Sequence, residues 1–282
     1  MIMRKQIGLL TDFGTKDGYV ASMKGVIASI CDDCTIIDLS HDITPQNVTE
    51  AALFLETCCA YFPEGFIFVV VVDPGVGTDR KILCLQTARK EQFFIAPDNG
   101  VLDLVVKQQD VKTVVSVENS QYWWDTASRT FHGRDIMGPV AAHLAAGTDI
   151  LELGPAIDPS TMKGLILPRQ SYIHTDGVIA GAVLKADHFG NIITNISADL
   201  LNDAKIEVND VLHVNFVKGK KILETLVVPF KKVYADVNPG EFVCLYNSEN
   251  RFELAINQGN ASSKMPMIAT ATEILVKKHA RP

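Results

Sequence analysis

Residues 66–80 read FIFVVVVDPGVGTDR. Seven apolar residues come first, without the alternation of apolar and polar side chains that marks a strand with one face in water. An unbroken apolar run of this length is typical of a strand buried on both faces, as in parallel sheets covered by helices. A carboxylate, Asp73, and a Pro-Gly turn end the run. The stretch therefore predicts a central strand of an α/β fold with a polar loop at its carboxyl end.

Strand and helix patterns alternate on both sides of this stretch. Apolar residues either form short runs or recur at helical spacing over most of residues 1–157. We expect strands at 7–10, 35–39, 82–87, 92–96 and 113–117, and helices at 19–30, 48–62, 102–107 and 136–146. This alternation predicts a layered, Rossmann-like α/β domain over residues 1–157, with helices on both faces of the sheet.

The pattern changes after about residue 155. Prolines and glycines interrupt a stretch without periodicity, and residues 158–177 are interpreted as a linker. Short β-rich runs separated by turn residues follow at 178–186, 211–217, 222–228, 242–246, 252–256 and 273–277. Closely spaced short strands are typical of a small barrel or sandwich. Residues 178–282 are therefore expected to form a second, β-rich domain.

The composition argues against several classes of protein. The 282 residues are 47% hydrophobic and carry a formal net charge of −7. An acidic protein is a poor partner for nucleic acid, because phosphates select basic surfaces. The longest apolar run is strand-sized, so no membrane-spanning segment is expected. The N-terminus is interpreted as a first strand and not as a signal peptide.

The six cysteines indicate a reducing compartment. They lie mostly inside apolar segments, as reduced core cysteines do, and they predict a cytoplasmic protein without a disulfide framework. Cys31 and Cys34 form one isolated C-x-x-C pair. Without a second pair or clustered histidines, this pair argues against zinc or redox chemistry, and no metal site is expected.

Polar clusters follow several of the predicted strands, where open α/β sheets bind their ligands. Thr11-Asp12-Phe13-Gly14 comes after the first strand, with Asp17 close behind. The carboxylate of Asp12 could accept hydrogen bonds from a vicinal diol such as a ribose, or it could cap a helix. Asp73 is followed by a glycine-rich turn that returns Arg80 toward it. That pattern suits either an anion site or a structural ion pair.

A further cluster, Phe131-His132-Gly133-Arg134-Asp135, opens the helix that ends near Gly147. A histidine at a helix N-terminus lies near the positive end of the helix dipole, which favours neutral imidazole. Neutral His132 could accept a proton or hold a water molecule. Metal binding by His132 and Asp135 would need further ligands, which no recognisable spacing supplies. In the second domain, Asp187 to Asn191 interrupts a strand pattern, and its glycine indicates a bulge or a nearby ligand.

Together these motifs resemble one family, the S-adenosyl-L-methionine hydroxide adenosyltransferases, which are related to fluorinase and chlorinase. The matching elements are Thr11–Gly14, Asp17–Val20, Met23–Gly25, Val72–Gly77, Ala96–Gly100, Phe131–Asp135 and Phe189–Asn191, in family order over nearly the whole chain. The resemblance implies an N-terminal α/β domain joined to a C-terminal β-barrel. It also implies a homotrimer that binds a small-molecule substrate between the N-terminal domain of one subunit and the C-terminal domain of its neighbour.

The resemblance also implies an activity, the hydrolysis of S-adenosyl-L-methionine to adenosine and L-methionine by a water or hydroxide that attacks C5′. Asp73, Arg80 and His132 match the set that holds this water, and no cofactor or metal is implied. Either Asp73 or His132 could accept its proton. The further matches are Asp12 for the ribose hydroxyls, Asp17 and Asp187 for the methionine ammonium, Asn191 for the adenine edge, Ser248 for the methionine carboxylate, and Phe131 beside His132 for substrate binding.

Several positions depart from the halogenase branch of the family. The halide-pocket tyrosine, threonine and serine of the halogenases match Asp73, Val76 and Gly133 here, so the hydroxyl groups that hold the halide are missing. Glu249 stands where the halogenases have an arginine after their carboxylate-binding serine, and Gln46 replaces an aromatic residue of the fluorinase pocket. These departures favour a hydrolase. A chlorinase-like halogenase and a protein that binds S-adenosyl-L-methionine or adenosine without turnover are the alternatives.

Overall fold

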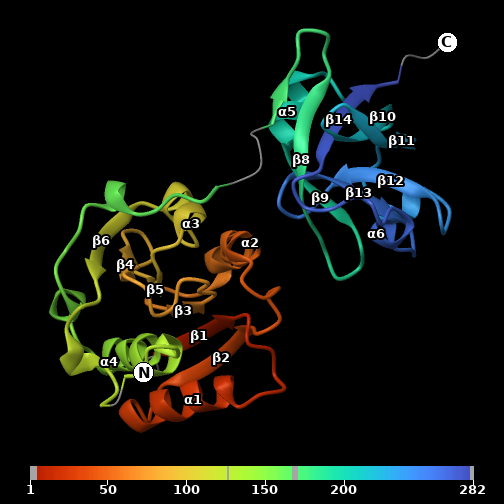
Figure 1. Cartoon of the computed structure of the whole chain (residues 1–282). Coiled ribbons are helices and arrows are strands. Elements are labelled where there is room, and N and C mark those ends of the chain that lie inside the picture. Colours follow the sequence, from red (N-terminus) through yellow and green to blue (C-terminus); the bar gives the residue numbers. More distant parts are fainter. Residues whose placement is uncertain (1–4, 126, 167–170, 280–282) are drawn as a thin grey trace. The chain divides into compact units, whose positions relative to one another are not determined.

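The computed structural model describes residues 5–125, 127–166 and 171–279. The chain divides into two compact units, Met1–Ile166 and Leu167–Pro282 (Figure 1). The expected linker, 158–177, spans this division. Its residues 158–166 lie in the first unit, its residues 171–177 lie in the second, and 167–170 fall outside the described residues.

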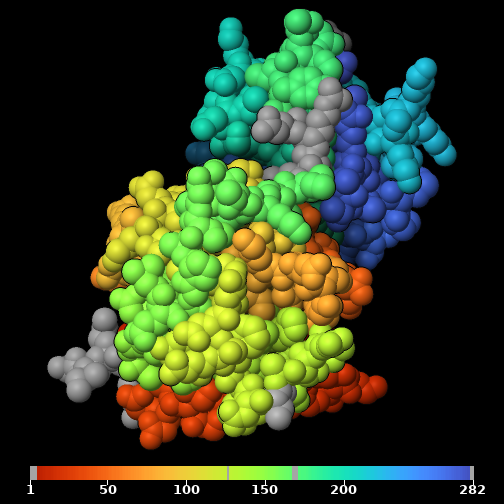
Figure 2. Space-filling view, turned by 60° about the vertical axis from the view of Figure 1, so that its left-hand side comes forward, coloured from red at the N-terminus to blue at the C-terminus, as the bar shows by residue number. Residues whose placement is uncertain are grey.

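The end of the first unit packs onto the rest of that unit. The backbone N–H of Lys163 donates to Asp98 Oδ1 (2.8 Å), and Ala156 forms a β-bridge with Val115. The segments after residue 117, yellow-green to green in Figure 2, cover much of the first unit's surface on the face shown. The proline-rich composition of this stretch therefore marks an irregular covering segment that belongs to the α/β unit.

A six-stranded sheet forms the centre of the first unit, in the order β2-β1-β3-β5-β4-β6. Its strands are β1 (Gln6–Thr11), β2 (Thr35–Ser40), β3 (Ile67–Val71), β4 (Ile82–Thr87), β5 (Phe93–Pro97) and β6 (Val111–Ser116). β1, β2, β3 and β5 pair in parallel, while β4 is antiparallel to both β5 and β6. The α/β class and the central place of the apolar run are confirmed.

Helices cover both faces of this sheet (Figure 1). They are α1 (Tyr19–Ile30), α2 (Val48–Cys58), α3 (Asp103–Gln108) and α4 (Gly138–Ala146). α1 packs against α4 on one face, and Ile67, Val69 and Val71 of β3 share a core with them. On the other face Phe68 stacks on Phe94, with ring centroids 4.6 Å apart, and α2 packs against α3. Since both faces are buried, β3 carries no polar residue.

The carboxyl end of α2 differs from the prediction. The helix expected over 48–62 ends at Cys58 and continues as a 3-10 turn, Cys59–Tyr61, before Pro63. The side-chain amide of Gln92 donates to the carbonyls of Cys59 (3.0 Å) and Pro63 (3.2 Å). A partner from the residue just before β5 thus satisfies carbonyls at the end of the helix.

The start of α4 also differs from the prediction. A π-helical turn, Gly133–Met137, precedes the helix that was expected over 136–146. Pro139 has no N–H to donate to the carbonyl of Asp135. That carbonyl accepts instead from the backbone N–H of Trp124 (2.8 Å). Single π-helical turns of this kind are frequent at functional sites, and this one follows His132.

The second unit is one antiparallel sheet, in the order β11-β10-β14-β8-β9-β13-β12, with β7 paired to β8. Its strands are β7 (Tyr172–Ile173), β8 (Ile179–Ala186), β9 (Ile192–Ser197), β10 (Val211–Lys218), β11 (Lys221–Pro229), β12 (Phe242–Tyr246), β13 (Arg251–Ile256) and β14 (Glu273–Lys278). Two short helices, α5 (Ala198–Asp203) and α6 (Ala261–Lys264), accompany them. A parallel bridge between Phe230 and Cys244 links the end of β11 to β12, so the sheet nearly closes into a barrel.

The barrel-like sheet encloses an apolar core. Val214, Phe216 and Phe252 are among its fully buried side chains. The expected β-rich domain is confirmed as barrel-like, although β7 and β9 were not predicted as separate strands. In the part of the chain that the structure describes, no helix is long and apolar enough to cross a membrane.

Gly8 in β1 has no side chain, and this allows the ring of Phe66 to pack directly against the strand. A Cβ at this position would lie 2.7 Å from the ring of Phe66 and 3.0 Å from Leu39 Cδ1. We expect Gly8→Ala to lower the free energy of unfolding by about 1–3 kcal/mol, since overpacking a buried layer has a cost of that size. Urea unfolding followed by circular dichroism measures the change.

Gly25→Ala is the matched control for this substitution. Gly25 lies on the exposed side of α1, and a Cβ there would meet no atom within 4 Å. Because alanine is the better helix former, this variant should keep the free energy of unfolding or raise it by up to about 1 kcal/mol. Equal losses in both variants would contradict the packing argument for Gly8.

Candidate active site

A guanidinium joins two other polar side chains at the carboxyl end of β3. Arg80 Nε donates to Asp73 Oδ2 (2.8 Å), and Arg80 Nη2 donates to the same oxygen and to His132 Nδ1 (2.7 Å). The side chains of Asp73 and Arg80 are only 5% and 6% exposed. The structure thus brings together the three residues that the resemblance assigns to the nucleophilic water.

Glycines shape the loop that returns Arg80 to Asp73. Asp73 Oδ1 accepts a hydrogen bond from the backbone N–H of Gly75 (3.2 Å). Gly77 has a φ of +80°, and a Cβ there would lie 2.7 Å from the carbonyl oxygen of Arg129. Only glycine fits both this conformation and this close contact. The sequence Gly-Val-Gly therefore serves the geometry of the Asp73–Arg80 pair.

His132 is a neutral ring whose proton lies on Nε2. Burial lowers the pKa of His132 below its usual value, and the positive charge of Arg80 lowers it further. A guanidinium carries only donors, so Nδ1 must accept the hydrogen bond from Arg80. The other nitrogen of a neutral imidazole then carries the hydrogen. His132 therefore offers Nε2–H as a donor and has no free acceptor nitrogen.

Aromatic rings connect the His132 segment to the loop after β1. Phe131 makes edge-to-face contacts with Phe13 and Tyr19, at centroid distances of 5.7 Å and 5.3 Å. Half of the Tyr19 surface is exposed. Phe131, which the resemblance places among the substrate contacts, thus fixes the approach of the Asp12 loop to His132.

Asp12 holds the loop in which it lies. Its Oδ2 accepts a hydrogen bond from the backbone N–H of Gln46 (2.7 Å), a residue with a φ of +66°. Asp17, the other carboxylate assigned to this region, is exposed in the loop before α1. The two carboxylates therefore differ, since Asp12 is fixed by a neighbouring segment while Asp17 faces solvent.

A buried histidine that sequence reasoning missed supports the same loop. His41 Nδ1 lies 2.9 Å from Thr11 Oγ1, and His41 Nε2 lies 2.9 Å from Asp38 Oδ1. The carbonyl of His41 also accepts from the N–H of Gly14 (2.8 Å). The signal for this role was its position directly after β2, next to the end of β1 in the sheet.

Asp135, considered as a metal ligand beside His132, is engaged in its own segment. Its Oδ1 accepts from Arg134 Nε (2.6 Å), and its Oδ2 accepts from the backbone N–H of Ser128 (2.7 Å). Across the described ranges, no group of three or more His, Cys, Asp or Glu side chains is arranged to hold a metal ion.

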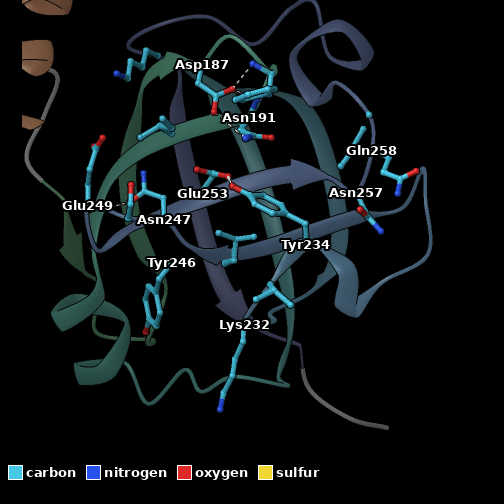
Figure 3. Close-up of a pocket in the computed structure, with 18 residues that line it drawn as sticks. Asp187, Asn191, Lys232, Tyr234, Tyr246, Asn247, Glu249, Glu253, Asn257 and Gln258 are labelled. Atoms are coloured by element: carbon cyan, nitrogen blue, oxygen red, sulfur yellow. Dashed lines mark hydrogen bonds between the residues drawn. The ribbon is translucent and has the colours of Figure 1, made fainter. Parts of the chain in front are cut away.

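The second unit carries the remaining predicted site residues in one pocket. Asp187, Asn191 and Ser248 line a cavity of about 900 Å³ (Figure 3). Asp187 Oδ1 accepts from the backbone N–H groups of Phe189 and Asn191, and Oδ2 accepts from Asn191 Nδ2, each at 2.9 Å. Both Asp187 oxygens therefore organise the turn between β8 and β9. Tyr234 and Glu253, which sequence reasoning missed, lie on the same pocket wall.

Two features define the class of protein to which this chain belongs. The α/β unit carries a buried Asp–Arg–His arrangement, and the barrel-like unit carries a pocket lined by three carboxylates. The family follows from comparison with known proteins. Residues 7–154 match the model of the SAM hydroxide adenosyltransferase N-terminal domain, and residues 181–270 match that of the C-terminal domain. The chain belongs to the SAM hydroxide adenosyltransferase family.

Relatives with named functions match along most of their length. An (R)-S-adenosyl-L-methionine hydrolase of Salinispora tropica is 34% identical over 261 residues, which cover 91% of this chain and 92% of that protein. A fluorinase of an Actinoplanes species is 30% identical over 274 residues, covering 89% and 90%. The crystal structure of an uncharacterized conserved protein from Thermotoga maritima has a TM-score of 0.87 at 36% identity, covering 96% of this chain and 100% of that one.

The protonation state of His132 can be tested by nuclear magnetic resonance of its ring nitrogens. We expect Nε2 to be protonated and Nδ1 unprotonated at neutral pH, with titration below the usual value of 6.5. Arg80→Gln removes a positive charge and leaves Asp73 beside the ring, so the pKa of His132 should rise.

His143 is the internal control for that titration. Its pKa is lowered by burial alone, and it lies outside the Arg80 cluster. Its titration should therefore be unchanged in Arg80→Gln. A proton on Nδ1 of His132 in the wild type, or equal shifts of both histidines in the variant, would contradict the assignment.

Proposed function

We propose that this chain is an S-adenosyl-L-methionine hydrolase, which forms adenosine and L-methionine by attack of water or hydroxide at C5′. The observation that carries the proposal is the Arg80 guanidinium that binds both Asp73 and His132. The relatives of this chain supply the substrate class, and the name of the Salinispora tropica hydrolase specifies the (R) form. The sulfonium sulfur carries three different carbon groups and is a stereocentre, and we take the (R) epimer as the substrate.

The charge of the substrate drives this reaction. The sulfonium is a cation, and methionine leaves as a neutral thioether, so a hydroxide-like nucleophile and the sulfonium cancel each other's charge at the transition state. Removing bulk water strengthens that attraction, from about 1 kcal/mol at 4 Å in water to about 4 kcal/mol at an effective dielectric of 20. No cofactor is needed, because the leaving group already carries its activating charge.

The protein's contribution is to hold and polarise the water. Arg80 and the Nε2–H of His132 donate toward it and stabilise developing hydroxide character. His132 cannot take the proton at Nε2, and its Nδ1 is occupied by Arg80. Asp73 is the one member of the set with acceptor capacity left, so we assign it the proton. Placing the water in line with the C5′–S bond selects this carbon over the methyl group.

The remaining contacts are proposed from the family resemblance. Asp12 binds the ribose hydroxyls, Asn191 the adenine edge and Ser248 the methionine carboxylate, with Phe131 beside the sugar. Asp17 is placed near the methionine ammonium. The six unpaired cysteines support a cytoplasmic location, since thiols persist in reducing compartments.

The surroundings of Gly133 disfavour the halogenase alternative. The resemblance places the halide-binding serine of the halogenases at this position. A Cβ on Gly133 would lie 2.9 Å from Val71 Cγ1 and 3.3 Å from Met23 Sδ. Valine is branched and stiff at its Cβ, so β3 leaves little room for a serine there. The hydrolase therefore fits this backbone better than a halogenase does.

Isotope labelling tests the proposed reaction. Purified protein is incubated with S-adenosyl-L-methionine epimerised at sulfur, in oxygen-18 water, and the products are separated by mass. We expect adenosine labelled at the 5′ oxygen, equimolar L-methionine, and recovery of the (S) epimer unreacted. With chloride in excess, no 5′-chloro-5′-deoxyadenosine should form.

His132→Ala is the control for that experiment. Turnover should fall about tenfold to a thousandfold, a typical effect of losing one polarising group, while substrate binding changes less. Tight binding of substrate without any labelled product in the wild type would support the non-catalytic alternative and overturn the hydrolase.

We further propose that the active protein is a homotrimer, with each site formed by the α/β unit of one subunit and the barrel of its neighbour. Each unit by itself carries only part of the proposed substrate contacts. Phe189, on the pocket wall of the second unit, is 73% exposed in the single chain. Cyclic assemblies with heterologous interfaces provide such composite sites.

Mixed subunits distinguish a composite site from a site within one chain. His132→Ala damages the α/β part, and Asn191→Ala damages the barrel part. Random co-assembly at equal amounts should restore about a quarter of the sites, because each intact site needs one undamaged half from each variant. If the site lies within one subunit, the mixture stays as inactive as its components. Light scattering on the same samples gives the number of subunits.

A further inference from the structure

Glu253 is a buried carboxylate that the proposed chemistry does not use. It lies on β13 between Phe252 and Leu254, whose side chains belong to the barrel core. Strand alternation turns Glu253 to the opposite face, where a charged residue normally meets water. Yet the residue is only 2% exposed. A carboxylate in this position has a cost that ordinary folding does not repay, which marks it as a functional candidate.

A single protein hydrogen bond satisfies this carboxylate within the described residues. The hydroxyl of Tyr234 donates to Glu253 Oε1 (2.8 Å), and the two side chains point toward each other at the centre of the pocket (Figure 3). The charges that act on Glu253 are those of Asp187 and Glu249, both negative. Lys232, at the pocket edge, extends away from Glu253 (Figure 3).

Burial raises the pKa of Glu253, and the charges of Asp187 and Glu249 raise it further, while the Tyr234 hydrogen bond opposes them. The same surroundings raise the pKa of Tyr234. The charges that act on Glu253 are therefore negative, although Lys185 and Lys232 also line the pocket and Arg251 Nε lies 3.8 Å from Glu249 Oε2. A cationic ligand group would supply the missing partner.

The sheet places Glu253 in the middle of the pocket wall. In register it lies opposite Ile193 of β9 on one side and Leu245 of β12 on the other, and both of these residues also line the pocket. The carboxylate thus has an apolar neighbour on each adjacent strand. These neighbours shield it from water and strengthen a contact with an ammonium group.

Asp187 is less available than Glu253 for the same task. Its two oxygens accept three hydrogen bonds from its own turn, from Phe189 and Asn191. Glu253 accepts one, from Tyr234. Asp187, one of the two carboxylates that the resemblance assigns to the methionine ammonium, is therefore largely engaged by the protein, while Glu253 on the same wall keeps acceptor capacity.

We infer that Glu253 binds the α-ammonium group of the methionine half of the substrate, with Asp187 and Glu249 keeping the surrounding wall negative. This inference rests on the proposed function and goes beyond it by naming the residue that selects an aminated substrate. It also accounts for Glu249 at the place of the halogenase arginine. A negative wall repels the methionine carboxylate, which must then turn away from Glu249.

Binding to the intact protein tests the inference without relying on turnover. Titration calorimetry compares three adenosyl thioethers, whose sulfur carries no charge. S-adenosyl-L-homocysteine carries ammonium and carboxylate, S-adenosyl-3-thiopropylamine carries the ammonium alone, and 5′-methylthioadenosine carries neither. Glu253→Gln keeps the shape of the side chain and an acceptor for Tyr234. It should weaken both aminated ligands about tenfold to a hundredfold and change the affinity for 5′-methylthioadenosine less than about twofold.

Two further variants separate recognition from structural effects. Glu224→Gln on β11, outside the pocket, is the matched control and should leave all three affinities unchanged. Tyr234→Phe removes the hydrogen bond that favours the ionised carboxylate. It should weaken the binding of the same aminated ligands that Glu253→Gln weakens, but by a smaller factor.

The outcomes are distinct. Unchanged affinity for the aminated ligands in Glu253→Gln, or an equal loss for 5′-methylthioadenosine, would overturn the role of Glu253 while leaving hydrolysis in place. If the wild-type protein bound none of the three, the adenosyl pocket itself would be absent, and the proposed function would fall together with this inference. Labelled adenosine in the oxygen-18 experiment decides between those cases.

Discussion

The hydrogen bonds of Arg80 are the interaction on which the first unit's site depends. A guanidinium that is 6% exposed must keep its partners, because an unpaired buried charge has a large cost. Asp73 supplies the opposite charge, and His132 supplies a neutral acceptor. This requirement ties the loop after β3, which carries Asp73 and Arg80, to His132, which lies fifty-two positions after Arg80. It also determines the proton position on His132, since no other tautomer can accept from Arg80.

The frame around this site was largely predictable, and the exceptions have local causes. The uninterrupted apolar run of β3 has one explanation, burial on both faces, and the helix pattern of α1 gave its bounds correctly. The π-helical turn before α4 could not be predicted from periodicity. It depends on which group meets the carbonyl of Asp135, and that group is the N–H of Trp124. The end of α2 likewise depends on Gln92, a residue more than thirty positions away.

The residues of the two candidate sites also divide into those that the sequence indicated and those that it did not. Asp73, Arg80 and His132 lie in motifs at the end of a strand or the start of a helix, where ligands bind, and the family resemblance joined them into one set. Glu253 was not indicated by the sequence. In the strand it alternates with apolar residues, and that pattern predicts exposure to water. Its hydrogen-bond partner, Tyr234, lies nineteen positions earlier and approaches it only in the folded barrel. Periodicity describes which face a residue takes, but it carries no information about what covers that face.

The two units treat charge in opposite ways, and a sulfonium amino acid suits both. Around Arg80 the charges balance, because Asp73 neutralises the guanidinium and His132 is neutral. Hydrogen-bond donors can therefore hold a hydroxide-like species there without a strong net attraction that would prevent its reaction. Around Glu253 the charges that act on the carboxylate are those of two other carboxylates, Asp187 and Glu249. A substrate with an ammonium group offsets this local negative charge when it binds, before any bond is broken. Its sulfonium charge is cancelled only as the C5′–S bond breaks. Binding therefore depends on the charge of the ammonium group, and catalysis depends on the charge of the sulfonium. Because these are separate charges of one molecule, a contact with the ammonium can increase the affinity without stabilising the sulfonium ground state against attack.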